Sequence, residues 1–299
     1  MRLSAGRNPL NIPKYPEFTG ITLEAREEVH PYLKSLEPQV SEFSFANLFL
    51  FRGAHNYRLS ILKDNSPVIA GNDRGRTFFM LPGGLPLQDI LKDLFENFSF
   101  MKCATEDEVQ KLISLGYEVM EDRDNFDYLY SRSALSSLAG RRFHRKKNLV
   151  NFFTGSYSYE ARPLLDEYME GARSVLEAWR SAQQEPGDYE AAKEALHLTE
   201  ELVLCGAIYF VEGKPAAYTL GEELNKTTFA VHFEKGVPGF KGLMQFVNKS
   251  FASILPEKYL YINREQDLGD EGLRKSKTSY RPVGFVKKYR AAPKGVWRP

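Results

Sequence analysis

Five consecutive polar residues, Asn263 to Asp267, carry the side chains of this chain best suited to chemistry. They follow the apolar run YLYI at 259–262, which predicts a short buried strand. An α/β sheet presents functional groups where its strands end, and carboxylates, an amide and a guanidinium can move protons and bind anions. The candidate catalytic residues here are Asn263, Arg264, Glu265 and Asp267. A structural cluster of ion pairs closing the sheet is the alternative.

A short helix is expected after this polar run, with Asp267 as its cap. Arg274 lies one turn after Asp270, and Lys277 lies on nearly the same face as Arg274. Because polar groups leaving a buried strand need partners, we expect Arg274 to reach back toward Glu265 or Asp267. Arg274 and Lys277 are also the candidate anion clamp.

A titratable pair flanks Phe233 at the end of another strand-like run, 227–233. Alternation along a strand predicts that His232 and Glu234 point the same way. A general base would be useful beside the glycine-bearing loop that follows. The alternative for His232 is a histidine satisfied at the edge of a sheet.

That loop, Gly236 to Gly242, connects a predicted strand to a predicted helix at 243–254. Such a turn directs backbone N–H groups and the positive end of the helix toward an anion. Lys241 and Gly242 are therefore candidate donor-phosphate contacts. Pro238 departs from a dinucleotide fingerprint, and no Ser or Thr follows Lys241 as a P-loop requires. The loop could hold a pyrophosphate or the end of an RNA, or be purely structural.

A basic run lies in the middle of the chain, within LAGRRFHRKKNLVN at 138–151. It could bind phosphates of RNA or of a nucleotide, or be a solvated helix face. The candidate contacts are Arg141, Arg142, Arg145, Lys146 and Lys147.

Composition is that of a globular protein, with 42% hydrophobic and 13% aromatic residues. The net charge of +1 means that any surface for a nucleic acid must be local. The five histidines are scattered without metal-ligand spacing, so no metal site is expected. The two cysteines, Cys103 and Cys205, are expected to be buried thiols. No apolar run reaches the ~18 residues of a membrane span, and a cytoplasmic location is expected.

The predicted elements form two halves with one rhythm: three strands, a glycine-bearing loop, a helix, a strand, a helix and a strand. In the first half the strands are expected at 57–62, 67–70 and 77–81, and in the second at 203–211, 216–220 and 227–233. This repeat indicates a duplication, with domains at 1–149 and 150–299.

Four segments resemble an uncharacterised bacterial family grouped with the carboxyl-terminal domain of phosphatidylglycerol lysyltransferases. They are LAGRRFHRKKN at 138–148, HFEKG at 232–236, KGLMQFVN at 241–248 and NREQDLGDEGLRKSKTSYRP at 263–282. The resemblance covers essentially the whole chain. It implies an α/β (α+β, mixed-sheet) fold of two tandem GNAT-like, or acetyltransferase-like, domains, with the active cleft in the second.

The resemblance also implies an activity. The lysyltransferases, and more distantly the Fem peptidyltransferases, move an aminoacyl group from aminoacyl-tRNA to a lipid or peptidoglycan acceptor, whereas ordinary GNAT enzymes use acyl-CoA. We expect an acyl- or aminoacyltransferase that acts on an amine or hydroxyl of a small molecule, peptide or lipid headgroup. No tightly bound cofactor is implied, and the donor is acyl-CoA or aminoacyl-tRNA.

Within this expectation Glu234 or His232 is the base, and Tyr280 of the SYRP segment joins the donor-binding residues. Only Gly242 matches the GNAT acyl-CoA motif, and the membrane segments of the lysyltransferases are absent, so a lipid acceptor is not carried over. Two alternatives stay open: an acyl-CoA-dependent N-acetyltransferase and a catalytically silent tandem-GNAT binding module.

Overall fold

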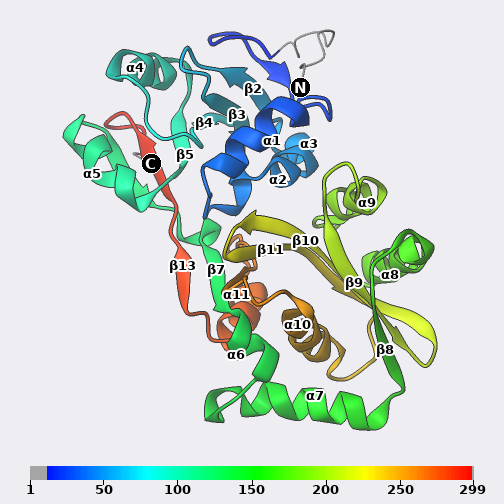
Figure 1. The fold of residues 1–299 in the computed structure, drawn as a ribbon. Coiled ribbons are helices and arrows are strands. Elements are labelled where there is room, and N and C mark those ends of the chain that lie inside the picture. Colours follow the sequence, from blue (N-terminus) through cyan, green and yellow to red (C-terminus); the bar gives the residue numbers. More distant parts are fainter. Residues whose placement is uncertain (1–11, 298–299) are drawn as a thin grey trace. The chain divides into compact units, whose positions relative to one another are not determined.

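The computed structural model describes residues 12–297, and their contacts divide into two compact units (Figure 1). Unit 1 consists of the chain up to Leu36, of Phe43–Met120, and of the chain from Tyr289 onward. Unit 2 consists of Glu37–Glu42 and Glu121–Lys288. The domain boundary expected between residues 149 and 150 lies inside helix α7 (His144–Ser156) of unit 2.

Unit 1 is built on a seven-stranded mixed sheet. In spatial order its strands are β1 (Thr19–Gly20), β2 (Arg58–Ile61), β3 (Pro67–Asp73), β4 (Arg76–Met80), β5 (Phe100–Ala104), β14 (Tyr289–Ala292) and β6 (Glu118–Glu121). Its helices are α1 (Arg26–Ser35), α2 (Phe45–Leu50), α3 (Arg52–His55), α4 (Gln88–Asn97) and α5 (Glu106–Ser114). A capping box formed by Thr105 and Glu108 fixes the start of α5. The core packs α4 and α5 against buried side chains of β4 and β5, including Phe79 and Met101.

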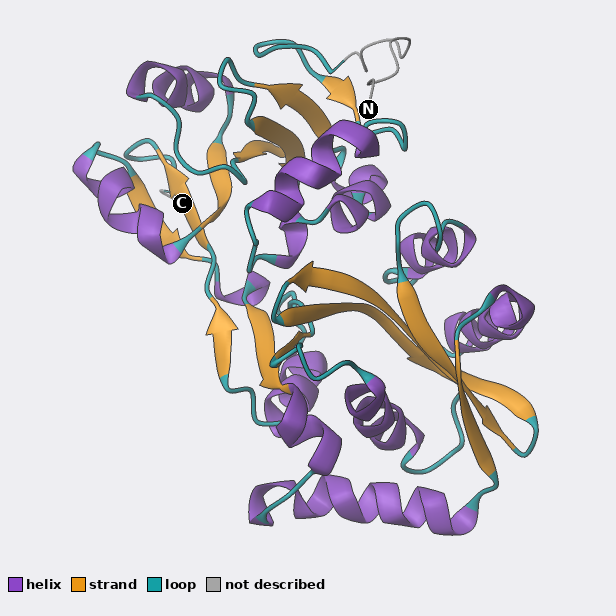
Figure 2. Cartoon of the chain, in the orientation of Figure 1, coloured by secondary structure: helices purple, strands orange, loops and turns teal. Residues whose placement is uncertain are grey.

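Unit 2 is built on a second seven-stranded mixed sheet (Figure 2). In spatial order its strands are β13 (Gly284–Val286), β7 (Asp127–Ser131), β12 (Tyr261–Asn263), β11 (Thr228–Gly236), β10 (Lys214–Asn225), β9 (Cys205–Val211) and β8 (Tyr159–Pro163). Its helices are α6 (Arg132–Ser137), α7, α8 (Met169–Ser181), α9 (Tyr189–His197), α10 (Leu243–Ile254) and α11 (Glu271–Ser279).

Helices cover both faces of the second sheet. Helix α10 packs on the face that carries Tyr209 and Val231. Gly171 of α8 packs against Ile208, which points to the opposite face from Tyr209. One face is therefore covered by α10 and the other by α8. Among the described residues, no helix has the length and apolar character needed to cross a bilayer.

The two sheets share one strand pattern, as the repeat in the sequence indicates. In each, three antiparallel strands (β2-β3-β4 and β9-β10-β11) are followed by a parallel neighbour, β5 or β12, and then by an antiparallel strand. That last strand is exchanged. Unit 1 receives β14 from the end of the chain, and unit 2 receives β7 from the end of the first half.

Helix α8 begins only at Met169, because the residues up to Pro163 form β8. Proline favours an extended conformation in the residue before it, and Arg162 accordingly lies in the strand. One expectation from the sequence is wrong: Cys205, expected to be buried, is exposed at the start of β9, whereas Cys103 is buried.

The exchange predicts the behaviour of fragments. A fragment of residues 150–299 lacks β7, which lies between β12 and β13, so we expect no cooperative thermal unfolding by circular dichroism. A fragment of residues 121–288 holds every strand of the second sheet and should show a transition. A cooperative transition in the 150–299 fragment would contradict this reading.

Candidate functional site

The polar residues after β12 lie where two neighbouring strands separate. The parallel strands β11 and β12 pair at only three positions, the last being Ala230 with Asn263. Strand β12 ends there, whereas β11 continues to Gly236. Two side-chain pairs cross this divergence: Arg264 to Glu234, and Glu265 to His232.

The first pair is a partly buried ion pair with unused hydrogen-bonding capacity. Arg264 Nη2 donates to Glu234 Oε1 at 2.7 Å, and the two side chains are 15% and 11% exposed. Burial opposes the charge of Arg264, but Glu234 outweighs it and raises the pKa of the guanidinium. Within the described part of the chain, neither side chain makes a further hydrogen bond. Most of the five N–H donors of Arg264, and Glu234 Oε2, are therefore available.

The second pair belongs to a buried triad. His232 Nδ1 lies 2.8 Å from Glu265 Oε1, and Nε2 lies 3.0 Å from Glu222 Oε1. Burial disfavours the charged imidazole, but the two carboxylates outweigh it and raise the pKa of His232 to about 10. An imidazolium that donates both protons cannot accept another. Of the two candidate bases, this arrangement leaves Glu234.

The expectation that His232 and Glu234 share a face is wrong. A β-bulge shifts the register of β10 and β11, so that Leu220 pairs with Phe233 and Gly221 with Val231. His232 is the extra residue, and a bulge breaks the alternation of side chains. Glu234 lies opposite Thr219, while Glu222, the partner of His232, points to the other face of β10.

The side chain of Asn263 is fully used inside unit 2. Its Nδ2 donates to the Gln39 carbonyl at 3.2 Å and to Asp127 at 3.1 Å, and its Oδ1 accepts from the Glu265 N–H at 2.8 Å. Asp127 in turn accepts from Lys288 at 2.6 Å, and both side chains are fully buried. This network argues for a structural role of Asn263 rather than the catalytic one considered from sequence.

Asp267 is the centre of a second network. Its buried carboxylate accepts from Arg274 Nε at 3.0 Å, Arg274 Nη2 at 2.7 Å and the Tyr128 hydroxyl at 2.7 Å. Burial would raise the pKa of Asp267, but these donors outweigh it and hold the pKa well below its usual range. The expected reach of Arg274 to Asp267 is confirmed. The expected cap is wrong, because Asp270 caps α11 by accepting from the Leu273 N–H.

Lys277 holds the loop rather than offering itself to an anion. Its Nζ donates to the carbonyls of Arg264 at 2.7 Å and Glu265 at 3.2 Å, and also to that of Gln266. An ammonium has three donors, and all are used. Burial, and then the charge of Arg264, lower the pKa of Lys277 to about 8. This bonding argues against the anion clamp expected from the sequence.

The two candidate residues of the glycine-bearing loop lie in different environments. Gly242 is buried with φ +89°, and a Cβ there would lie 2.2 Å from the Leu149 carbonyl oxygen of α7. Close packing against α7 thus explains this glycine. Lys241 is exposed, with Nζ 4.6 Å from the ring centroid of Phe152.

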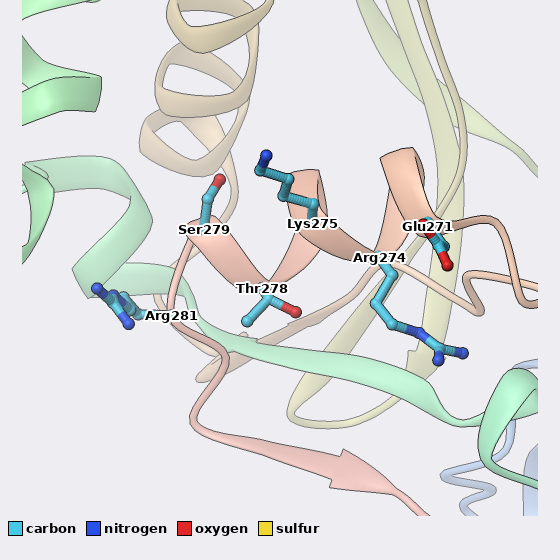
Figure 3. Close-up of a pocket in the computed structure, with 6 residues that line it drawn as sticks. All are labelled: Glu271, Arg274, Lys275, Thr278, Ser279 and Arg281. Carbon is cyan, nitrogen blue, oxygen red and sulfur yellow. The ribbon is translucent and has the colours of Figure 1, made fainter.

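A shallow, open hollow of about 520 Å³ runs along α11 (Figure 3). Its lining residues are Glu271, Arg274, Lys275, Thr278, Ser279 and Arg281. In Figure 3, Lys275 and Ser279 extend from one side of the helix, and Arg274 and Thr278 from the other. Of the predicted site residues, only Arg274 lines it.

One member of the basic run reaches the Arg264 site. Arg141, Arg142, Arg145 and Lys147 are exposed. Lys146 instead turns inward from α7, with Nζ 4.0 Å from the ring centroid of the buried Tyr280. Burial, and then Arg264, lower the pKa of Lys146.

Sequence reasoning missed several members of these networks, above all Tyr128, Tyr130 and Asp127 of β7. Tyr130 lies close to Arg264 and Glu234, which both influence its pKa, while burial raises it. The alternation in DYLYS was a usable strand signal. The domain boundary expected at residue 150 places this strand in the first half of the chain, whereas its contacts belong to unit 2.

Comparison with known proteins identifies related sequences. The model of the family "Phosphatidylglycerol lysyltransferase, C-terminal" matches residues 33–292. A conserved protein of unknown function from Bacteroides thetaiotaomicron is 32% identical, with a TM-score of 0.84 over 93% of this chain and 99% of that one. An uncharacterized protein of Mycoplasmoides gallisepticum is 21% identical over 173 residues, and the match covers 54% of each chain, about half the length of that relative.

More distant solved structures share the fold. The C-terminal domain of a putative lysylphosphatidylglycerol synthetase from Agrobacterium fabrum has a TM-score of 0.63 at 13% identity, over 91% of this chain and 92% of that one. FemX has 0.57 at 10% identity, over 92% and 96%. A tandem GNAT protein from the clavulanic acid pathway has 0.50 at 9% identity, over 92% and 97%. The expected mixed α/β, tandem GNAT-like fold is confirmed.

The triad around His232 predicts a pH dependence. The pKa of His232 in the folded state is about 10, above the ordinary value of 6.5. The contribution of the charged imidazole to stability is therefore complete below pH 6.5 and is lost as the pH rises toward 10. The difference in unfolding free energy between the wild type and His232→Gln, measured in urea, should narrow over that range. By NMR the imidazole should not titrate between about pH 5 and 8. A midpoint near the ordinary value would refute the triad.

Lys277 and its neighbour Lys275 form a matched pair on α11. Lys277→Met removes donors from three loop carbonyls, so we expect a loss of about 2 kcal/mol in urea unfolding. Lys275 is exposed, and Lys275→Met should change stability by less than about 0.5 kcal/mol. Equal effects of the two substitutions would show that the carbonyl contacts contribute nothing.

Proposed function

Because the chain belongs to the phosphatidylglycerol lysyltransferase C-terminal domain family, we propose that unit 2 transfers an aminoacyl group to an amine or hydroxyl acceptor at the Arg264–Glu234 pair. Membership of the family supports aminoacyl transfer in general. The observation that carries the assignment to this pair is its unused hydrogen-bonding capacity in a partly buried position, where the remaining donors and the second carboxylate oxygen can still be reached.

The two groups have complementary roles in such a transfer. Glu234 Oε2 accepts the proton of the acceptor amine or hydroxyl as its nitrogen or oxygen attacks the carbonyl carbon of the donor. The N–H groups of Arg264 stabilise the negative charge that develops on the carbonyl oxygen. When the tetrahedral intermediate collapses, the bond to the donor's leaving oxygen or sulfur breaks, and that atom takes up the proton that Glu234 had accepted. No covalent bond to the enzyme is needed, because positioning brings the reactants together.

Aminoacyl-tRNA is the donor that we propose, with acyl-CoA as the alternative. The packing of α7 against Gly242 supports this choice, since the turn that would receive the pyrophosphate of acyl-CoA already has a backbone carbonyl against its glycine. The acceptor that we propose is a small molecule, peptide or lipid headgroup bearing an amine or hydroxyl.

Glu234→Gln tests the base, because the amide keeps an acceptor for Arg264 but cannot take up a proton. We expect transfer of a radiolabelled aminoacyl group from aminoacyl-tRNA to a panel of amines to slow by about 10²–10⁴-fold. The melting temperature should stay close to that of the wild type. Glu257→Gln, at an exposed turn, is the matched control and should leave transfer unchanged.

Transfer by Glu234→Gln at the wild-type rate would refute the role of Glu234. Transfer from acyl-CoA but not from aminoacyl-tRNA, lost equally in Glu234→Gln, would replace the donor and keep the site.

A further inference from the structure

Resting on the proposed function, we propose that Lys146, Arg264 and Tyr280 form an anion subsite that continues along α7 and holds the phosphodiester backbone of a nucleic-acid donor. The three residues come from α7, from the loop after β12 and from the end of α11. All belong to unit 2.

The charges around Tyr280 are not balanced. Lys146 Nζ lies 4.0 Å from the centroid of the Tyr280 ring, and the guanidinium carbon of Arg264 lies 5.6 Å from it. Glu234 is the carboxylate that pairs with Arg264, and Lys146 has no carboxylate partner among the described residues. Two partly buried cations thus share one carboxylate, and an incoming anion would lower the energy of both.

The Tyr280 hydroxyl strengthens this arrangement. Burial, with a smaller contribution from Glu234, raises its pKa to about 12, so it stays protonated at neutral pH. It is therefore able to donate a hydrogen bond to an anion. A phosphate oxygen accepts well from an ammonium, a guanidinium and a phenol together.

A polymeric anion fits better than a single phosphate because the positive charge continues along α7. Arg141, Arg142, Arg145 and Lys147 are exposed next to Lys146. Further along the helix, Phe152 is 43% exposed, with Lys241 against its ring. Cations interleaved with an exposed aromatic ring are what single-stranded nucleic acids bind, by phosphate contacts and base stacking.

A membrane surface fits less well. Phe152 is the one large apolar side chain that α7 exposes, according to the exposures of the described residues. Insertion of a helix into the bilayer interface needs a continuous apolar face. The exposed face of α7 is instead polar and basic, with Arg145 and Asn148 preceding Phe152 at helical spacing.

The test uses the full chain and a fluorescein-labelled, unstructured 12-nucleotide RNA, followed by anisotropy over a salt series. Lys146→Met keeps the apolar stem and removes the charge. We expect affinity to fall at least fivefold, and the slope of log affinity against log salt to decrease by about 0.7. Lys214→Met, at the exposed first residue of β10, should match the wild type.

Equal RNA affinity of Lys146→Met and wild type would overturn the subsite. The subsite would also be overturned if binding to phosphatidylglycerol vesicles depended on Lys146 and RNA binding did not. Full displacement of the RNA by coenzyme A at the same concentration as the RNA would overturn it as well. Glu234→Gln removes the carboxylate that the two cations share, so it should bind RNA at least as tightly as the wild type even though transfer is slowed. Lys146-dependent RNA binding without any transfer activity would leave the subsite standing and remove the proposed reaction.

Discussion

The structure of unit 2 depends on one constraint: β11 and β12 stop pairing after Ala230 and Asn263 while β11 runs on. Backbone groups freed at such a point must find other partners, and here side chains cross the divergence in their place. One crossing, at His232, is a saturated triad of charges. The other, at Arg264, is a pair with capacity to spare. The His232 triad holds the two strands in position, so the Arg264–Glu234 pair can keep hydrogen-bonding groups unused.

The loop between β12 and α11 is held from two directions. Lys277 bonds to its carbonyls, while Asp267 draws Arg274, Arg123 and the Tyr128 hydroxyl to one carboxylate. Burying so many charges is costly unless they are mutually satisfied, and removal of one member then exposes the others. The conformation that places Arg264 beside Glu234 is therefore set by residues that need not touch a substrate.

Local periodicity predicted the repeated strand order, and the resemblance to the lysyltransferase family implied the mixed-sheet fold. The demand of buried charges for partners predicted that Arg274 would contact Glu265 or Asp267. Sequence patterns could not predict the β-bulge at His232, which turns a side chain to the other face of the sheet without a signal in the sequence. They also could not predict that all three N–H donors of Lys277 are used. Nor could they give the pairing of β7 with β12 and β13, which lie more than a hundred residues further on. Pairings over such separations leave no trace in local propensity.

The exchange of β7 and β14 has a consequence for synthesis on the ribosome. Strand β14, which pairs with β5, follows every strand of unit 2 along the chain, so the sheet of unit 1 stays incomplete until unit 2 has been synthesised. Unit 2 holds β7 from early on but waits for β12 and β13. Neither half can mature while the other is being made, and the long-range pairings favour slow folding after release. A stalled or truncated nascent chain would leave the edges of both sheets open.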